Sequence, residues 1–119
     1  MNLTTISKAI YADLNEKQME AVMLQSQSAL VLAGAGSGKT RVLTSRISWL
    51  IENQLTSPGG ILAVTFTNKA AKEMLTRIST QLPINIRGMW VGTFHGLCNR
   101  FLRKHHIDAN LPETFQILD

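Results

Sequence analysis

The feature that most constrains the fold is the glycine-rich stretch AGAGSGKT at residues 33–40, which joins an apolar run to an amphipathic pattern. The apolar run SALVLA (residues 28–33) predicts a buried strand. After Gly38, apolar residues recur at helical spacing, at Val42, Leu43, Ile47, Leu50 and Ile51. A glycine loop between a strand and a helix is the setting in which backbone N–H groups surround phosphate oxygens. The sequence therefore predicts a phosphate-binding loop.

The residues of this loop follow the pattern Gly-x4-Gly-Lys-Ser/Thr except at the first position, where Ala33 replaces glycine. Its remaining members are Gly34, Ala35, Gly36, Ser37, Gly38, Lys39 and Thr40. We expect Lys39 to reach the β- and γ-phosphates of ATP and the Thr40 hydroxyl to ligate Mg²⁺. The following helix adds the positive end of its dipole. The alternative is a glycine-rich turn without a ligand.

Strands and helices are predicted to alternate along the rest of the chain. Strands are expected at residues 61–66 and 89–93, and the segment FQIL (115–118) is a candidate for a fourth. Helices are expected at residues 16–25, after Asn15 as N-cap, from Gly38 to about residue 51, from Ala70 to the residue before Pro83, and from Phe94 onward. This alternation indicates an α/β fold with a parallel sheet and flanking helices.

Two near-copies of one short motif end two of the predicted strands: VTFTN at residues 64–68 and GTFHG at 92–96. The carboxyl ends of parallel strands lie along one edge of a sheet, where ligands bind. We therefore expect both motifs and the glycine loop at the same edge. Phe94 shares an apolar helical stripe with Leu97 and Phe101, so its ring is expected to be buried, whereas Phe66 is expected to be the more exposed ring.

Composition and charge restrict the class of protein. With 119 residues the chain is long enough for one domain with a core, and its net charge is +4. Residues 31–107 hold ten basic residues against two acidic ones, which suits a polyanionic partner, although a solvated basic surface would look the same. No apolar run is long enough to cross a membrane. Cys98 is the only cysteine, which fits a reducing cytoplasm.

Four stretches in this order and spacing resemble the first motifs of superfamily 1A DNA helicases of the UvrD/Rep/PcrA group. They are LNEKQMEAV, LAGAGSGKTRVLTSRI, ILAVTFTNKAAKEM and MWVGTFHGLCNRFLR. The resemblance covers nearly the whole chain. It implies that residues 1–119 are the N-terminal part of the RecA-like P-loop motor domain 1A, with the Q motif, Walker A, and motifs Ia and Ib.

The resemblance also implies roles for individual residues. Gln18 would read the edge of adenine, and Arg41 would lie near the base. Single-stranded or partly duplex DNA would be contacted at two motifs, by Thr65, Phe66, Thr67 and Asn68 and by Thr93, Phe94 and His95. The implied activity is ATP-dependent 3′–5′ unwinding in nucleotide-excision and mismatch repair, with repair proteins as partners, in the bacterial cytoplasm at the nucleoid.

The sequence departs from a complete helicase in one respect. No apolar run ends in the Asp-Glu pair that would bind Mg²⁺ and activate water. We therefore expect a segment of a larger protein that hydrolyses ATP negligibly by itself and that self-associates through an unpaired sheet edge. The alternatives are another P-loop ATPase, such as a small-molecule kinase, and a non-enzymatic nucleic-acid-binding module.

Overall fold

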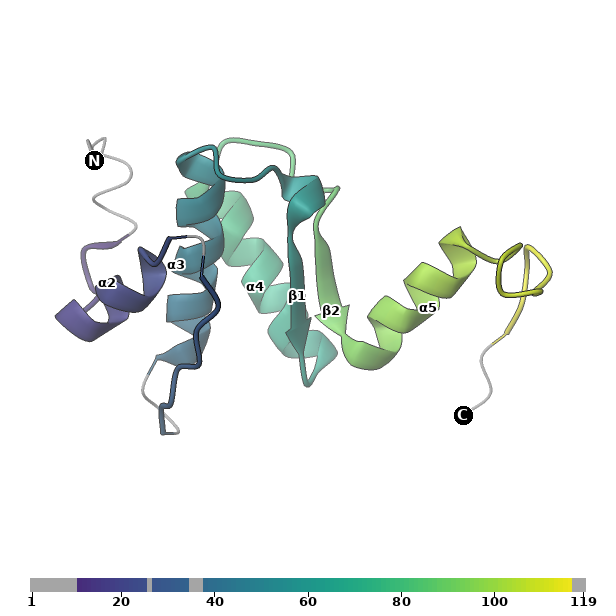
Figure 1. The fold of residues 1–119 in the computed structure, drawn as a ribbon, viewed down its shortest axis with the longest axis horizontal. Coiled ribbons are helices and arrows are strands. Elements are labelled where there is room, and N and C mark those ends of the chain that lie inside the picture. Colours follow the sequence, from purple (N-terminus) through teal and green to yellow (C-terminus); the bar gives the residue numbers. More distant parts are fainter. Residues whose placement is uncertain (1–10, 26, 35–37, 117–119) are drawn as a thin grey trace.

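The computed structural model describes residues 11–25, 27–34 and 38–116 and shows helices arranged around a small parallel sheet (Figure 1). Helices α2 (Glu16–Val22) and α3 (Lys39–Glu52) come first, followed by the 3-10 turn η1 (Pro58–Gly60) and strand β1 (Leu62–Thr65). Helix α4 (Asn68–Gln81), strand β2 (Trp90–Thr93) and helix α5 (Phe94–Lys104) complete the order. The predicted α/β alternation is confirmed for these elements.

The two strands are adjacent and parallel, with Leu62 opposite Trp90 and Thr65 opposite Thr93. The connection between them passes through α4, as parallel pairing requires. Both strands end at the lower side of Figure 1, and α3, α4 and α5 begin on that same side. The edge of the sheet that we expected to carry ligands is therefore surrounded by helix N-termini.

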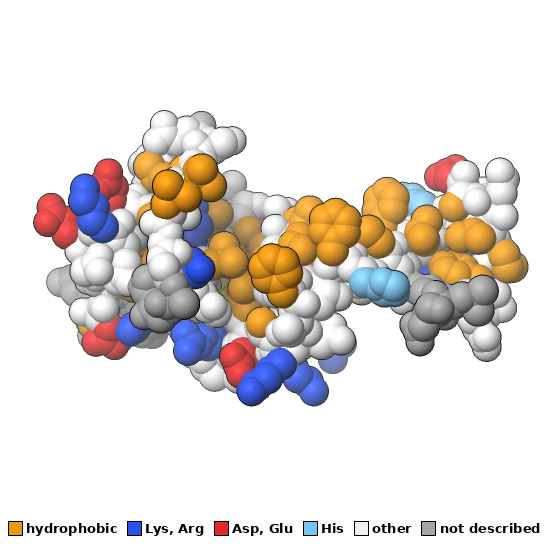
Figure 2. Space-filling model, turned by 90° about the horizontal axis from the view of Figure 1, so that it is seen from below, with side chains coloured by type: hydrophobic (Ala, Val, Ile, Leu, Met, Phe, Trp, Pro, Cys, Tyr) orange, Lys and Arg blue, Asp and Glu red, His pale blue; other side chains and the backbone are white. Residues whose placement is uncertain are grey.

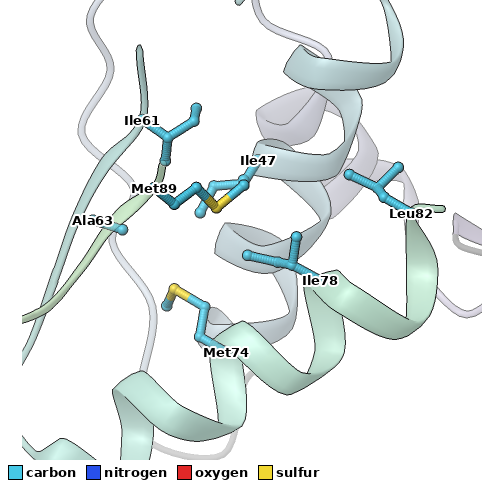
Figure 3. Packing of buried hydrophobic residues seen from close by; sticks show 7 residues of the cluster. All are labelled: Ile47, Ile61, Ala63, Met74, Ile78, Leu82 and Met89. Atoms are coloured by element: carbon cyan, nitrogen blue, oxygen red, sulfur yellow. The ribbon is translucent and has the colours of Figure 1, made fainter. Parts of the chain in front are cut away.

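The main core lies between the sheet and the pair of helices α3 and α4 (Figure 3). In α4, residues 71, 74 and 78 are buried, the spacing of a helix with one apolar face. Ala63 of β1 meets this face, whereas Leu62 and Val64 point to the other side of the sheet because side chains alternate along a strand. The cluster consists of Ile47, Ile61, Ala63, Met74, Ile78, Leu82 and Met89.

A second, smaller cluster joins α2 to α3. Tyr11, Val22 and Trp49 are buried together. Arg46 of α3 donates to the carbonyl of Val22 at 2.8 Å and to that of Leu24, which satisfies carbonyls left open at the end of α2. Burial lowers the pKa of Arg46.

The hydroxyl of Tyr11 extends this second cluster to the C-terminal end of α3. It donates to Glu52 Oε2 at 3.1 Å. Burial, and then the neighbouring carboxylate, raise the pKa of Tyr11. The phenol therefore stays neutral and keeps its proton for this hydrogen bond at physiological pH. The segment before α2 is thus tied to α3 by both packing and a hydrogen bond.

The strand predicted at residues 28–33 is wrong for this structure. Residues 27–34 form no strand, and the side chains of Leu30 and Leu32 are 85% and 88% exposed. A buried strand needs hydrogen-bonded neighbours and cover on both faces. Among the described residues, β1 and β2 pair only with each other, so this apolar segment has no strand to join.

The end of the chain also differs from the sequence-based prediction. Phe115 and Gln116 are not in a strand, and Ile117 and Leu118, the other half of the candidate fourth strand, lie outside the described residues. Instead, Arg103 of α5 donates to the carbonyl of Phe115 at 2.8 Å and lies over its ring. Within the described ranges, no helix is both long and apolar enough to cross a membrane.

Candidate functional site

Both Thr-Phe motifs lie at the same edge of the sheet, as predicted, and α3, whose first residue is Lys39, begins on that side of the molecule. Figure 2 views the molecule from this side, with apolar side chains across the middle and Lys and Arg side chains gathered along one border. The described part of the loop is Ala33, Gly34 and Gly38, whereas the predicted phosphate-binding residues Ala35, Gly36 and Ser37 lie outside the described residues. The loop leads into α3 at Lys39.

Lys39 and Gln18, which are 21 positions apart in the sequence, line one cavity of about 260 Å³. Lys39 is the first residue of α3, and Thr40 follows it; both are exposed. A cation and free N–H groups at a helix N-terminus favour an anion in this position. The lining comprises Asn15, Lys17, Gln18, Ala21, Val31, Leu32, Ala33, Lys39 and Val42.

The amide of Gln18 is oriented by a capping box at the start of α2. Asn15 Oδ1 accepts from the backbone N–H of Gln18 at 2.9 Å, and Gln18 Oε1 accepts from the backbone N–H of Asn15 at 2.9 Å. Nε2 lies on the side of Gly38, so the cap holds this side chain between α2 and the loop.

Gly38 has a left-handed backbone, with φ of 84°. A Cβ atom at this position would lie 3.1 Å from Gln18 Nε2. We therefore expect Gly38→Ala to lower the free energy of unfolding by about 1–2 kcal/mol, since a side chain is strained at positive φ. Chemical denaturation monitored by circular dichroism measures this change.

Gly34→Ala is the matched control, because no atom lies within 4 Å of a Cβ built on Gly34. The control should stay within about 0.5 kcal/mol of the unmodified protein. An equal loss for both variants would contradict the assignment of the cost to the left-handed position.

Arg41 was expected near the nucleotide base, but it does not line the cavity. Its guanidinium is paired with Asp13 instead, with Nη2 2.5 Å from Oδ2. Both side chains are partly solvent-exposed, so this ion pair contributes little to stability. Sequence reasoning missed Asp13, because nothing in the spacing of residues 13 and 41 indicates that they meet.

The two Thr-Phe motifs are capped differently despite their similar sequences. In the first, Thr67 is the N-cap of α4, and its Oγ1 accepts from Ala70 N at 3.1 Å. In the second, Thr93 is itself the N-cap of α5, and its Oγ1 accepts from Gly96 N at 3.0 Å. The helix after β2 therefore begins two residues earlier relative to the paired threonines Thr65 and Thr93.

This difference determines where the two phenylalanines lie. Phe66 lies in the bend between β1 and the N-cap and is 103% exposed, which agrees with the prediction. Phe94 is the first residue of α5 and is 73% exposed, so the prediction that its ring is buried is wrong. In the helical stripe on which that prediction rested, Leu97 is buried but Phe101 is 54% exposed. The neighbours Asn68 and His95 are also exposed.

An apolar groove of about 400 Å³ lies behind Phe94, on the face of the sheet opposite the main core. Its walls come from β1, β2 and α5, and Gly92 lets Leu97 approach the sheet, since a Cβ there would lie 3.5 Å from Leu97 Cδ2. Trp90 is half-buried, with the guanidinium of Arg100 4.2 Å from its ring centre. The groove is lined by Leu62, Val64, Trp90, Phe94, Leu97, Cys98, Phe101 and Leu102.

Comparison with known proteins identifies the family to which this chain belongs. Residues 14–119 match the UvrD/REP helicase N-terminal domain. The chain belongs to this family, and the resemblance inferred from its motifs is confirmed.

Curated relatives with high identity are DNA helicases of bacteria. The chain is 62% identical to DNA helicase II of Salmonella typhimurium (strain LT2) over 106 residues, 89% of this chain and 15% of that protein. The values are the same for DNA helicase II of Escherichia coli K12. It is 45% identical to ATP-dependent DNA helicase PcrA of Bacillus subtilis over 114 residues, 96% of this chain and 15% of that protein. The chain thus spans about 15% of the length of these relatives.

Proposed function

We propose that this chain is the N-terminal part of motor domain 1A of an ATP-dependent DNA helicase. In this role it supplies one wall of the ATP site and a contact surface for single-stranded DNA. The observation that carries the proposal is that β1 and β2 end together and that α3 begins, at Lys39, on the same side of the molecule. Membership of the UvrD/REP family supports the same function.

The nucleotide side of the proposal rests on the cavity between α2 and α3. Lys39 neutralises β- and γ-phosphate charge, and the N-terminus of α3 adds backbone donors. Gln18, held by its capping box, presents an amide to the adenine edge. Thr40 would hold Mg²⁺ through its hydroxyl, and the bound ion would neutralise phosphate charge. Ala33, Gly34, Ala35, Gly36, Ser37 and Gly38 form the proposed cradle, and Arg41 is assigned to this site by family resemblance alone.

The DNA side uses the residues that follow β1 and β2. Phe66 offers a fully exposed ring on which a base can stack, and Phe94 offers a second, partly packed one. Asn68, the first residue of α4, and His95, the second residue of α5, are exposed. Both present N–H groups and side chains to phosphates. Thr65, Thr67 and Thr93 add hydroxyls at the same edge. Base stacking combined with contacts to the DNA backbone does not distinguish between DNA sequences, as a motor that moves along DNA requires.

The whole helicase is proposed to unwind DNA in the 3′–5′ direction in excision and mismatch repair, with the proteins of those pathways as partners, in the cytoplasm at the nucleoid. The steps assigned to this chain are the binding of ATP and the binding of single-stranded DNA. Because α3 begins on the side where β1 ends, a change in the nucleotide at Lys39 is proposed to alter the binding of the DNA strand at Phe66. Hydrolysis needs carboxylates, and neither of the described strands β1 and β2 is followed directly by one.

Replacing Phe66 with alanine tests the DNA side in the full-length helicase. Loss of one base stack costs about 1–3 kcal/mol, so affinity for a single-stranded oligonucleotide should fall about 5- to 150-fold. Fluorescence anisotropy with labelled oligothymidylate measures the affinity. ATP affinity without DNA should stay the same.

Phe101→Ala serves as the control, because Phe101 lies on α5, packs edge-on against Trp90 and is partly exposed away from the strand ends. The control should retain its DNA affinity. If Phe66→Ala binds the oligonucleotide as tightly as the unmodified helicase, base stacking at this edge is ruled out.

A further inference from the structure

The solvent side of α4 carries a row of basic residues that the proposed DNA contacts do not include. Lys69, Lys72 and Arg77 are all exposed, on the opposite side of the helix from the buried residues Ala71, Met74 and Ile78. Their spacing places them on one helical face. Together with Glu73 and Thr76, they line a shallow surface hollow of about 480 Å³.

The positive charge of this face is not neutralised by ion pairs. Glu73 lies four positions from both Lys69 and Arg77, yet none of the ion pairs within the described ranges involves these three residues or Lys72. Three cations against one carboxylate leave an excess of positive charge in the hollow. The ordinary attraction between i and i+4 charges is modest, so the cations remain available to an external anion.

The row is continuous with the proposed DNA edge. Lys69 is the second residue of α4, three positions after Phe66, and α4 begins at the side where β1 ends (Figure 1). From Lys69 to Arg77 the helix rises about 12 Å. In Figure 2 the basic side chains, with an acidic one among them, form a border beside the apolar centre of this face. A single DNA strand that runs from Phe66 along α4 therefore meets this row without crossing the body of the domain.

We propose that the basic face of α4 is a phosphate track that binds the sugar–phosphate backbone of the nucleotides flanking the one stacked on Phe66. The inference rests on the proposed function and extends the strand along α4. Lys69 and Lys72 act as point charges, and the guanidinium of Arg77 can bind a phosphate through two parallel N–H groups. Among the described residues, no aromatic or large apolar side chain lines the hollow, so it contacts the DNA backbone and does not distinguish bases. The same lack of apolar groups disfavours insertion into a lipid surface.

The test uses the full-length helicase and two oligothymidylates, one of about four nucleotides and one of about 16, the limits of common single-strand site sizes. Each phosphate contact contributes about 0.7 to the slope of log affinity against log salt for single strands. Lys72→Gln and Arg77→Gln should each reduce the slope for the long oligonucleotide by that amount. The double variant should bind it about tenfold more weakly at low salt. The short oligonucleotide reaches fewer of these cations, so its slope and affinity should fall by less.

Two control variants sharpen the result. Arg87→Gln removes the same charge from the exposed loop before β2, at the opposite edge of the sheet, and should leave the slope unchanged. Glu73→Gln removes the acidic group from the hollow and should tighten binding of the long oligonucleotide. Circular dichroism melting of every variant checks that the fold is retained.

The outcomes separate this inference from the proposed function. If Phe66→Ala weakens binding while Lys72→Gln and Arg77→Gln match Arg87→Gln, the track is refuted and the proposed DNA edge stands. If the unmodified helicase binds neither oligonucleotide, the proposed function fails. An equal loss for the short and the long oligonucleotide would also overturn the track, because the short one reaches fewer of its cations. A loss confined to binding of an acidic protein would assign the face to a different partner and refute it as a DNA track.

Discussion

Ile78→Ala should lower the free energy of unfolding by about 2–5 kcal/mol, the range measured for truncating a large aliphatic side chain in a core. Ile78 of α4 is fully buried, with 0% of its surface exposed, in the cluster that joins α3 and α4 to the sheet (Figure 3). The loss combines the transfer free energy of the removed atoms with the cavity that they leave.

Ile107→Ala is the matched control for this prediction, because Ile107 is 78% exposed beyond the end of α5. The same chemical change should cost about 0.5 kcal/mol or less at this position. Urea denaturation of both variants measures the two free energies of unfolding. The slope of the free energy against urea concentration should be the same for both variants. Similar losses at positions 78 and 107 would show that the cluster around Ile78 is not the main core.

Helix α4 shows how much of the fold could be predicted from the sequence. The apolar stripe through Met74 and Ile78 predicts a helix with one buried face that ends before Pro83, and the structure has α4 from Asn68 to Gln81 with that face buried. The start was placed two residues late because the cap is a hydrogen bond of the Thr67 side chain, which apolar spacing does not reveal. Periodicity thus predicts the body of a helix better than its ends.

The apolar run at residues 28–33 shows the limit of the same reasoning. Its composition predicts a buried strand, but a strand is stabilised by neighbours that lie elsewhere in the sequence. The described chain has two strands, and they pair with each other. Leu30 and Leu32 are therefore exposed, although the residues themselves favour burial. A local sequence pattern does not indicate whether another strand is available to pair with it.

Some features of the candidate site could likewise be predicted from local sequence patterns, whereas others depend on contacts between residues far apart in the sequence. Motif spacing predicted that the ends of β1 and β2 share one edge, because parallel strands end together, and α3 begins at Lys39 on the same side of the molecule. The pairing of Arg41 with Asp13 and the exposure of Phe94 depend on how α2 and α5 pack, which the motifs do not encode. The two Thr-Phe motifs look alike in sequence, yet their different helix starts give their rings different surroundings.

Lys39→Ala in the full-length helicase should weaken ATP binding about 10- to 150-fold, because a hydrogen bond to a charged group contributes about 1.5–3 kcal/mol. Lys39 is exposed at the first turn of α3 and lines the cavity that also contains Gln18, so its loss should not destabilise the fold. AMP provides the sharpest comparison. It lacks the β- and γ-phosphates that Lys39 is proposed to contact, so its affinity should change little.

The matched control for this prediction is Lys72→Ala, which removes the same charge from α4 rather than from the nucleotide cavity. It should leave ATP affinity intact, because the effect of Lys39 is a direct contact and screened charges act over only about 10 Å at ordinary salt. Isothermal titration calorimetry with ATP and AMP measures the affinities of the unmodified helicase and of both variants. A comparable loss for AMP and ATP in Lys39→Ala would mean that this lysine holds the nucleoside or the α-phosphate. A loss for ATP in Lys72→Ala equal to that in Lys39→Ala would mean that charge alone, and not the position of Lys39 at the start of α3, governs binding.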